Sequence, residues 1–117
     1  MTSEFAELEK LGLELYKKGN LIGSLRFFER GLKIALDARD AERCAKAHLH
    51  IGIIMLDKGE LSLAGDNFHL ATVLFRKTGD IYKEKLSSFY HGKVCCLQGN
   101  FKNAFDKLEH SCRISPN

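Results

Sequence analysis

Two pairs of side chains in this sequence have the residue types and spacing that chemistry requires. His91 and Cys95 are four residues apart, so they share one face if the segment is helical. An imidazole and a thiolate so placed form half of a zinc site or a Cys–His nucleophile pair. No third ligand and no orienting carboxylate follows at helical spacing, and His110 with Cys112 is a weaker pair still. We therefore expect no metal, no cofactor and no enzyme activity, and stoichiometric zinc in purified protein would overturn that expectation.

Composition narrows the remaining function classes. The chain has 117 residues, of which 44% are hydrophobic and 28% charged, and its net charge is +3. Lys and Arg are scattered among Asp and Glu without a basic block, which disfavours nucleic acid as a partner. The four cysteines form no CxxC motif and are interpreted as free thiols in a reducing compartment. The polar N-terminus and the lack of a long apolar run indicate no signal peptide and no membrane span, so the predicted location is cytoplasmic.

Small and apolar residues recur along the chain with a constant period, and the elements that they form must position any functional site. The spacing between equivalent residues is 40, and the sets are Gly12, Gly52 and Gly92; Gly19, Gly59 and Gly99; Ser24, Ala64 and Ala104; and Phe28, Phe68 and Leu108. A period of this size is typical of stacked structural repeats.

The repeating segments are predicted to be helices, at about 3–18, 21–38, 41–58, 61–77, 81–98 and 101–115. Ser3, Asn20 and Asp40 are placed to cap helix starts, and the glycines at 19, 59 and 99 to close helices in the left-handed conformation. Because the links are short, consecutive helices must pair antiparallel. We expect one all-α domain over 1–117, with repeats at about 3–40, 41–80 and 81–117. The mid-helix glycines at 12, 52 and 92 imply a contact too close for a Cβ.

These residues resemble the tetratricopeptide repeat (TPR). The Leu-Gly element of that motif appears as Leu11-Gly12, Ile51-Gly52 and His91-Gly92, followed by the turn glycine, a small residue and an aromatic. The 40-residue period is similar to the subclass in Pins-like spindle adaptors, rapsyn and kinesin light chains. The resemblance implies a right-handed superhelical solenoid of three helix pairs, whose first helices line a concave groove that binds segments of partner proteins.

The groove predicted from this resemblance is basic and partly apolar. Its residues follow the spacing 6, 10, 13, 17 in each first helix and comprise Lys10, Leu13, Lys17, Lys46, His50, Ile53, Asp57, Leu86, Tyr90, Lys93 and Leu97. Four Lys against one Asp favour an acidic amphipathic segment of another protein. The alternative is a solvated helix face with incidental apolar residues. The Lys/Asn clamp and the Asn row that some members of the family use have no counterpart at these positions.

The two ends of the array differ. Glu9 and Tyr16 lie on the side expected to face a preceding repeat, where the second repeat has the apolar Leu49 and Leu56. The N-terminal end is therefore predicted to have the polar outer surface of a terminal repeat. The C-terminal end is predicted to be an interface made by Phe105, Cys112 and Ile114. Either the chain is the first part of a longer repeat array, or two copies form a homodimer through this end. A structural or assembly module is thus the second function hypothesis, unless Phe105 folds back and leaves a monomer.

Overall fold

The computed structural model describes residues 3–113 and contains six α-helices. Their bounds are α1 (Glu4–Lys17), α2 (Leu21–Asp37), α3 (Ala41–Asp57), α4 (Leu61–Thr78), α5 (Ile81–Leu97) and α6 (Phe101–Arg113). The helices predicted at 3–18, 21–38, 41–58, 61–77 and 81–98 agree with these bounds to within one residue. The described part of the sixth ends at Arg113. Residues 3–113 contain no strand, which confirms the all-α prediction.

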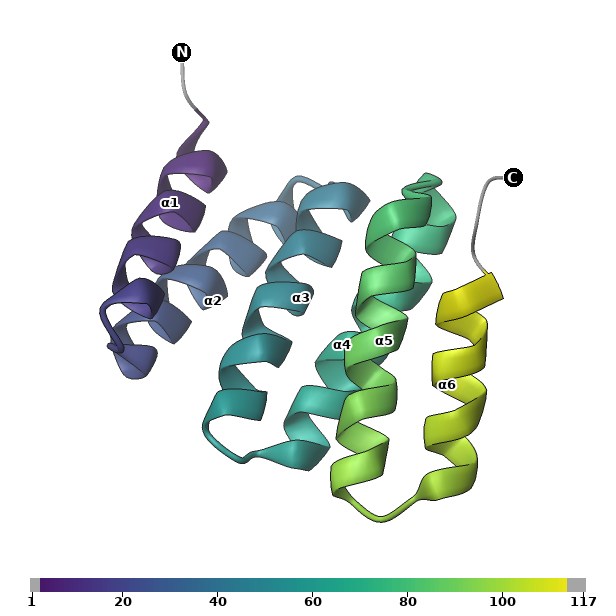
Figure 1. Ribbon diagram of the computed structural model, residues 1–117. Coiled ribbons are helices and arrows are strands. Elements are labelled where there is room, and N and C mark those ends of the chain that lie inside the picture. Colours follow the sequence, from purple (N-terminus) through teal and green to yellow (C-terminus); the bar gives the residue numbers. More distant parts are fainter. Residues whose placement is uncertain (1–2, 114–117) are drawn as a thin grey trace.

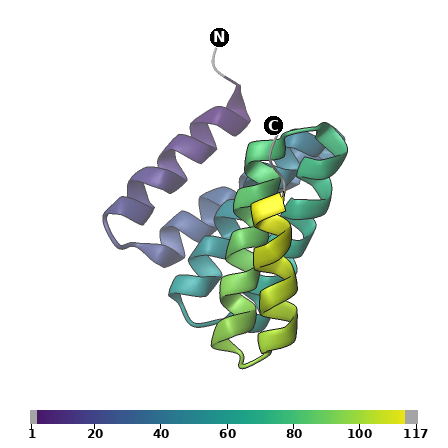
Figure 2. The ribbon, with the colours of Figure 1, turned by 45° about the vertical axis from the view of Figure 1, so that its right-hand side comes forward.

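The helices pack in consecutive antiparallel pairs, and each pair packs on the next (Figures 1 and 2). Among the described residues, α1 also approaches α3 and α3 approaches α5, whereas α2, α4 and α6 do not approach one another. The odd-numbered helices therefore lie on the more closely spaced side of an elongated molecule that measures 42 × 31 × 22 Å.

Local capping explains where the helices begin and end. The side chains of Ser3, Asn20, Asp40 and Asp80 each accept a hydrogen bond from the backbone N–H three residues on, at 2.9 to 3.1 Å. Each satisfies a donor that the first turn of a helix leaves free. Gly19, Gly59 and Gly99 have φ near +80°, as predicted from their positions after the last helical turn.

The contacts of the mid-helix glycines confirm the predicted close approach and show its partner. A Cβ placed on Gly12 would lie 2.8 Å from the ring of Phe28, and one on Gly52 would lie 2.7 Å from the ring of Phe68. At Gly92 the corresponding distance is 2.9 Å to Leu108. In each pair, the large side chain of the second helix thus packs directly against the mid-helix glycine of the first helix. In the first pair, Ser24 adds a hydrogen bond from its Oγ to the carbonyl oxygen of Gly12, at 2.7 Å.

The second helix pair supplies most of the core. Ala64, Phe68, Phe75 and Val94 are fully buried and pack together with Leu49, joining α3, α4 and α5. The third pair is thereby fixed to the second through apolar contact.

Arg39 occupies a position that favours glycine. Its φ is +53°, and the equivalent residue 40 positions later in the next turn is Gly79, with φ +80°. A left-handed conformation costs a non-glycine residue about 1 to 2 kcal/mol. Glycine avoids this strain but loses more conformational entropy on folding, which offsets part of the gain. Arg39→Gly is therefore expected to raise the free energy of unfolding by about 0.5 to 1 kcal/mol in a urea titration. Gly79→Ala is the matched control and should lower it, and a less stable Arg39→Gly protein would contradict the argument.

Candidate functional site

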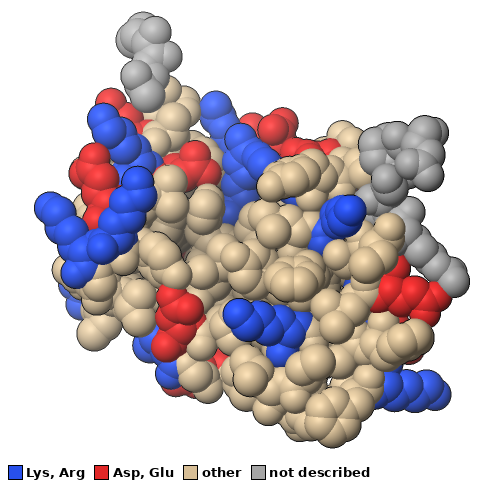
Figure 3. Space-filling view, in the orientation of Figure 1, with Lys and Arg blue, Asp and Glu red and all other residues tan. Residues whose placement is uncertain are grey.

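The surface formed by α1, α3 and α5, hereafter the odd-helix face, is the strongest candidate for a binding site. Figure 3 views it in the orientation of Figure 1, with uncharged side chains across much of its middle. Two adjoining cavities open on this face.

The first cavity lies between α1 and α3 and has a volume of about 170 Å³. Its walls are almost entirely apolar, and it is lined by Leu13, Tyr16, Phe28, His50, Ile53 and Ile54. The imidazole of His50 stacks on the ring of Phe28, with centroids 4.6 Å apart and planes 18° apart. We call this the α1–α3 cavity, and its size and lining suit one apolar side chain.

The second cavity, called the central cavity, has a volume of about 320 Å³ and is contacted by all three odd-numbered helices. It shares Leu13 and His50 with the α1–α3 cavity. The rest of its lining mixes apolar and charged residues, namely Glu9, Lys46, Leu49, Tyr82, Lys83 and Leu86. The two cavities therefore form one continuous depression with an apolar end and a mixed end.

Polar contacts across the helices modify the charge of this face. Glu9 Oε2 lies 3.3 Å from His50 Nε2, and that hydrogen bond lowers the pKa of Glu9. The hydroxyl of Tyr16 donates to the Asp57 carboxylate, which raises the pKa of Tyr16 to about 12. Lys46 Nζ lies 3.7 Å from Glu42 Oε1 on the preceding turn of its own helix. Because part of the Lys charge is balanced locally, the face is less basic than the sequence count of Lys and Asp indicates.

The structure brings together only part of the predicted groove. Five of the predicted residues line the two cavities: Leu13, Lys46, His50, Ile53 and Leu86. Tyr90 instead stacks on Phe68, with centroids 5.2 Å apart, and is half-buried against the core. The others are exposed and lie outside both cavity linings: Lys10, Lys17, Asp57, Lys93 and Leu97.

Glu9 and Tyr16 require a correction. They were expected to face a preceding repeat, but their partners His50 and Asp57 belong to α3, so both side chains face the following helix pair. The reason is the rotation of α1 about its axis, which spacing along one helix does not fix. Their equivalents Leu49 and Leu56 also face the following pair, since both pack into the cluster that contains Val94 of α5. The 40-residue equivalence was the signal that could have placed Glu9 in the site beside Leu49.

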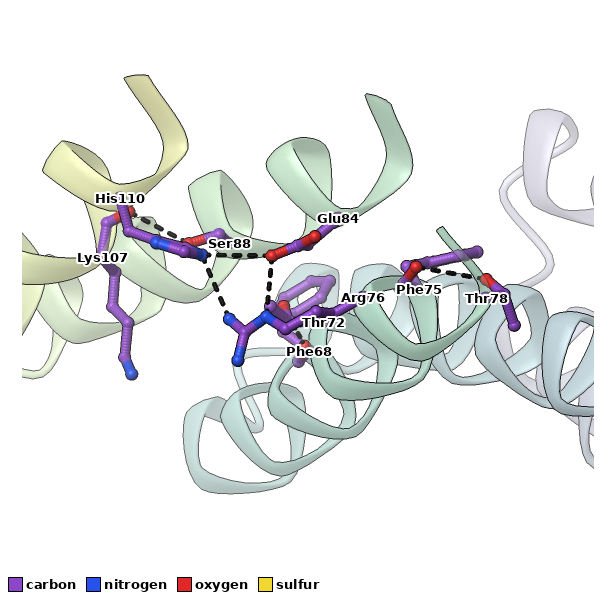
Figure 4. Close-up of polar contacts among 9 residues, drawn as sticks. All are labelled: Phe68, Thr72, Phe75, Arg76, Thr78, Glu84, Ser88, Lys107 and His110. Atoms are coloured by element: carbon purple, nitrogen blue, oxygen red, sulfur yellow. Dashed lines mark hydrogen bonds and ion pairs between the residues drawn. The ribbon is translucent and has the colours of Figure 1, made fainter. Parts of the chain in front are cut away.

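A separate polar cluster ties α4, α5 and α6 together (Figure 4). The nearly buried carboxylate of Glu84 accepts a hydrogen bond from Arg76 Nε at 2.9 Å. His110 Nε2 lies 3.3 Å from the same oxygen and 3.2 Å from Arg76 Nη2. A neutral imidazole nitrogen can donate to the carboxylate or accept from the guanidinium but not both, so the tautomer decides between the two bonds. A buried carboxylate with these two partners is satisfied, and the cluster acts as a clamp on the last helix.

His91 and Cys95 lie in environments that keep them uncharged. Burial, with help from nearby Lys107 and His69, lowers the pKa of His91 to about 4. Burial likewise raises the pKa of the Cys95 thiol. A reactive cysteine requires the opposite shift, toward the thiolate. Within residues 3–113, no three His, Cys, Asp or Glu side chains are grouped so that they could hold a metal ion.

The C-terminal end is open in the described structure. Phe105 is 66% exposed, so it does not fold back into its own helix pair, and Cys112 is exposed as well. Ile114, the third residue predicted for this interface, lies outside the described residues. Because Leu49 and Leu56 are covered by the next pair, their equivalents Phe89 and Cys96 also belong to this open end, and both are exposed.

No protein-family model matches the chain, and no curated protein does. In the part of the chain that is described, no helix has the length and apolar character needed to cross a membrane.

Proposed function

We propose that the chain is a TPR-like protein, a right-handed superhelical solenoid of three helix pairs, and that it acts as an adaptor that binds a segment of another protein. The support is that two features recur in all three pairs: a mid-helix glycine packed against a large side chain of the next helix, and a left-handed glycine in the turn between the two helices. The closer spacing of the odd-numbered helices supports a groove on their side. An adaptor of this kind is neither an enzyme nor a nucleic-acid binder, and its free thiols fit a cytoplasmic location.

The observation that carries the proposal is the pair of adjoining cavities. Because they share Leu13 and His50, one partner segment can place an apolar side chain in each of them. Helical segments bind to such grooves through anchors spaced i, i+3 or i+4. Lys46 and Lys83 outnumber Glu9 in the lining of the mixed end, so its charge favours acidic residues of the segment. The proposed partner is therefore an acidic amphipathic helix with two or three Leu or Phe anchors.

A peptide titration tests the proposed groove. An acidic helical peptide with Leu and Phe anchors is expected to bind more tightly than a basic peptide of equal hydrophobicity, and added salt should weaken its binding. Leu13→Asp places a carboxylate where the two cavities meet and should weaken binding by at least about tenfold. Fluorescence anisotropy measures the affinities, and chemical shifts should change at Leu13, His50 and Leu86.

Leu36→Asp is the matched control, because Leu36 is an exposed leucine on α2 and lies outside both cavity linings. Equal affinity for the two peptides, or equal effects of the two substitutions, would discard the groove as the binding site.

The second candidate function, an assembly module, is favoured by the open C-terminal end. Phe89, Phe101 and Phe105 are 47%, 71% and 66% exposed. Aromatic side chains dominate the energetics of interfaces, and three of them exposed on two adjacent helices favour an interaction surface here.

A further inference from the structure

The open C-terminal end consists of one side of α5 and one side of α6. Figure 2, in which the right-hand side of Figure 1 comes forward, shows these two helices with no other helix in front of them. On α6, Phe101, Phe105 and Cys112 follow the spacing i, i+4, i+11 and are all exposed. Tyr82 and Phe89 are exposed on α5. We call this surface the end face.

The end face is unsuited to another helix pair stacked in the regular way. At the preceding junction, the residue equivalent to Phe105 is Gly65, where an added Cβ would already lie 3.6 Å from Val94 of the covering helix α5. A Cβ would fit there in ordinary van der Waals contact, but the further atoms of a phenyl ring would meet Val94 and His91 of α5. At the end face a phenyl ring that is 66% exposed stands in that place. A helix arriving in the register of α5 would meet this ring.

A cavity that can receive a ring lies further along the same two helices, and its lining residue on α6, Ser111, is six residues or about 9 Å from Phe105. It has a volume of about 200 Å³ and opens between α5 and α6, lined by Tyr82, Lys85, Leu86, Phe89 and Ser111. Its lining is almost wholly apolar, and Lys85 is the one charged residue in it. The ammonium group of a lysine attracts the face of an aromatic ring. The end face therefore presents a projecting aromatic side chain and an aromatic-lined hollow together.

We propose that the occupant of the end face is a second copy of this chain, with Phe105 of each copy inserted into the cavity of the other. A two-fold axis that runs midway between the ring and the cavity brings both insertions about at once, as an isologous interface requires. A face that meets itself must carry little charge, because like charges would be apposed. The cavity lining holds one charge, Lys85, and helical spacing places Glu109 beside Phe105 and Cys112, so the charges near this face are few and of both signs. This inference rests on the assembly function proposed above, and its cavity shares Tyr82 and Leu86 with the central cavity of the odd-helix face.

Sedimentation equilibrium of the full chain over a concentration series tests for the dimer. The parent is expected to dimerise, and Phe105→Ala should raise the dissociation constant at least about tenfold. Ile22→Ala is the matched control, since Ile22 is 64% exposed on α2, and should leave the constant unchanged. A parent that stays monomeric at every concentration would overturn the second copy as the occupant.

Mixing two variants tests the reciprocal insertion itself. Phe105→Ala removes the ring, and Phe89→Glu places a carboxylate in the cavity wall; circular dichroism should show both proteins folded. Each variant alone retains no ring-in-cavity contact, whereas their heterodimer retains one, so mixing should restore association relative to either variant. A dimer that Phe105→Ala leaves intact, or a mixture no tighter than its parts, would overturn the insertion while the assembly function stands.

Discussion

Gly52→Val is expected to lower the free energy of unfolding by about 3 kcal/mol or more, because no side chain fits between α3 and α4 at this point. A Cβ on Gly52 would lie 2.7 Å from Cε1 of Phe68, well inside van der Waals contact. The Phe68 ring cannot move aside cheaply, since it is fully buried and stacked on Tyr90 at 5.2 Å. Interiors this closely packed transmit such an overlap as strain.

Urea unfolding followed by circular dichroism measures this loss. Gly59→Val separates the effect of a close contact from that of backbone strain, because Gly59 has φ +79° and an added Cβ would meet nothing within 4 Å. This variant should lower the free energy of unfolding only by the roughly 1 to 2 kcal/mol of left-handed strain. Phe68→Ala removes the opposing ring, and in the double variant the cost of Gly52→Val should shrink, because the two residues are in contact. Equal costs of Gly52→Val in the presence and absence of the Phe68 ring would refute the contact as the cause.

Features that depend on neighbours along the chain could be predicted from the sequence. The caps at Asn20 and Asp40 join residues three apart, and the left-handed glycines follow directly from where the helices end. The contact of Gly52 with Phe68 was also within reach, because each helix pair repeats the same small and large residues. Three recurrences of one pattern constrain a packing arrangement that one occurrence would not.

Features that depend on the rotation and spacing of whole helices could not be predicted in the same way. Glu9 lies beside His50, and Glu84 beside Arg76 and His110, only because of how successive pairs are turned relative to one another. No helical spacing encodes a contact across 26 or 41 residues of chain, as in Glu84–His110 or Tyr16–Asp57. Five of the twelve residues that line the two cavities were therefore predicted, from the spacing that the resemblance implies for the groove, and the charge pairs of the site were not.

His91 should make the stability of the fold depend on pH, because burial of its ring disfavours the protonated form. An unfolded chain returns its imidazole to a pKa of about 6.5, whereas in the folded protein burial, Lys107 and His69 hold it at about 4, against the opposing effect of Asp66. Between these two values the unfolded state binds the extra proton, so stability increases with pH through this window. The contribution of neutral His91 is complete above about pH 6.5 and is lost as the pH falls toward 4.

His91→Leu is accordingly expected to have little effect on the free energy of unfolding at pH 7.5 and to raise it at pH 5, relative to the parent, by about 1 to 2 kcal/mol. The lower bound allows for the solvent that still reaches the half-buried ring. Urea titrations of both proteins at the two pH values measure the difference, and taking it between the two proteins cancels the contribution of Glu9, which both contain. His69→Leu is the comparison variant, because it removes the smaller effect of His69 on the pKa of His91 while that ring stays buried, so most of the pH dependence should remain. Parallel losses of stability in the parent and His91→Leu would show that His91 takes up its proton as readily in the folded protein as in the unfolded chain.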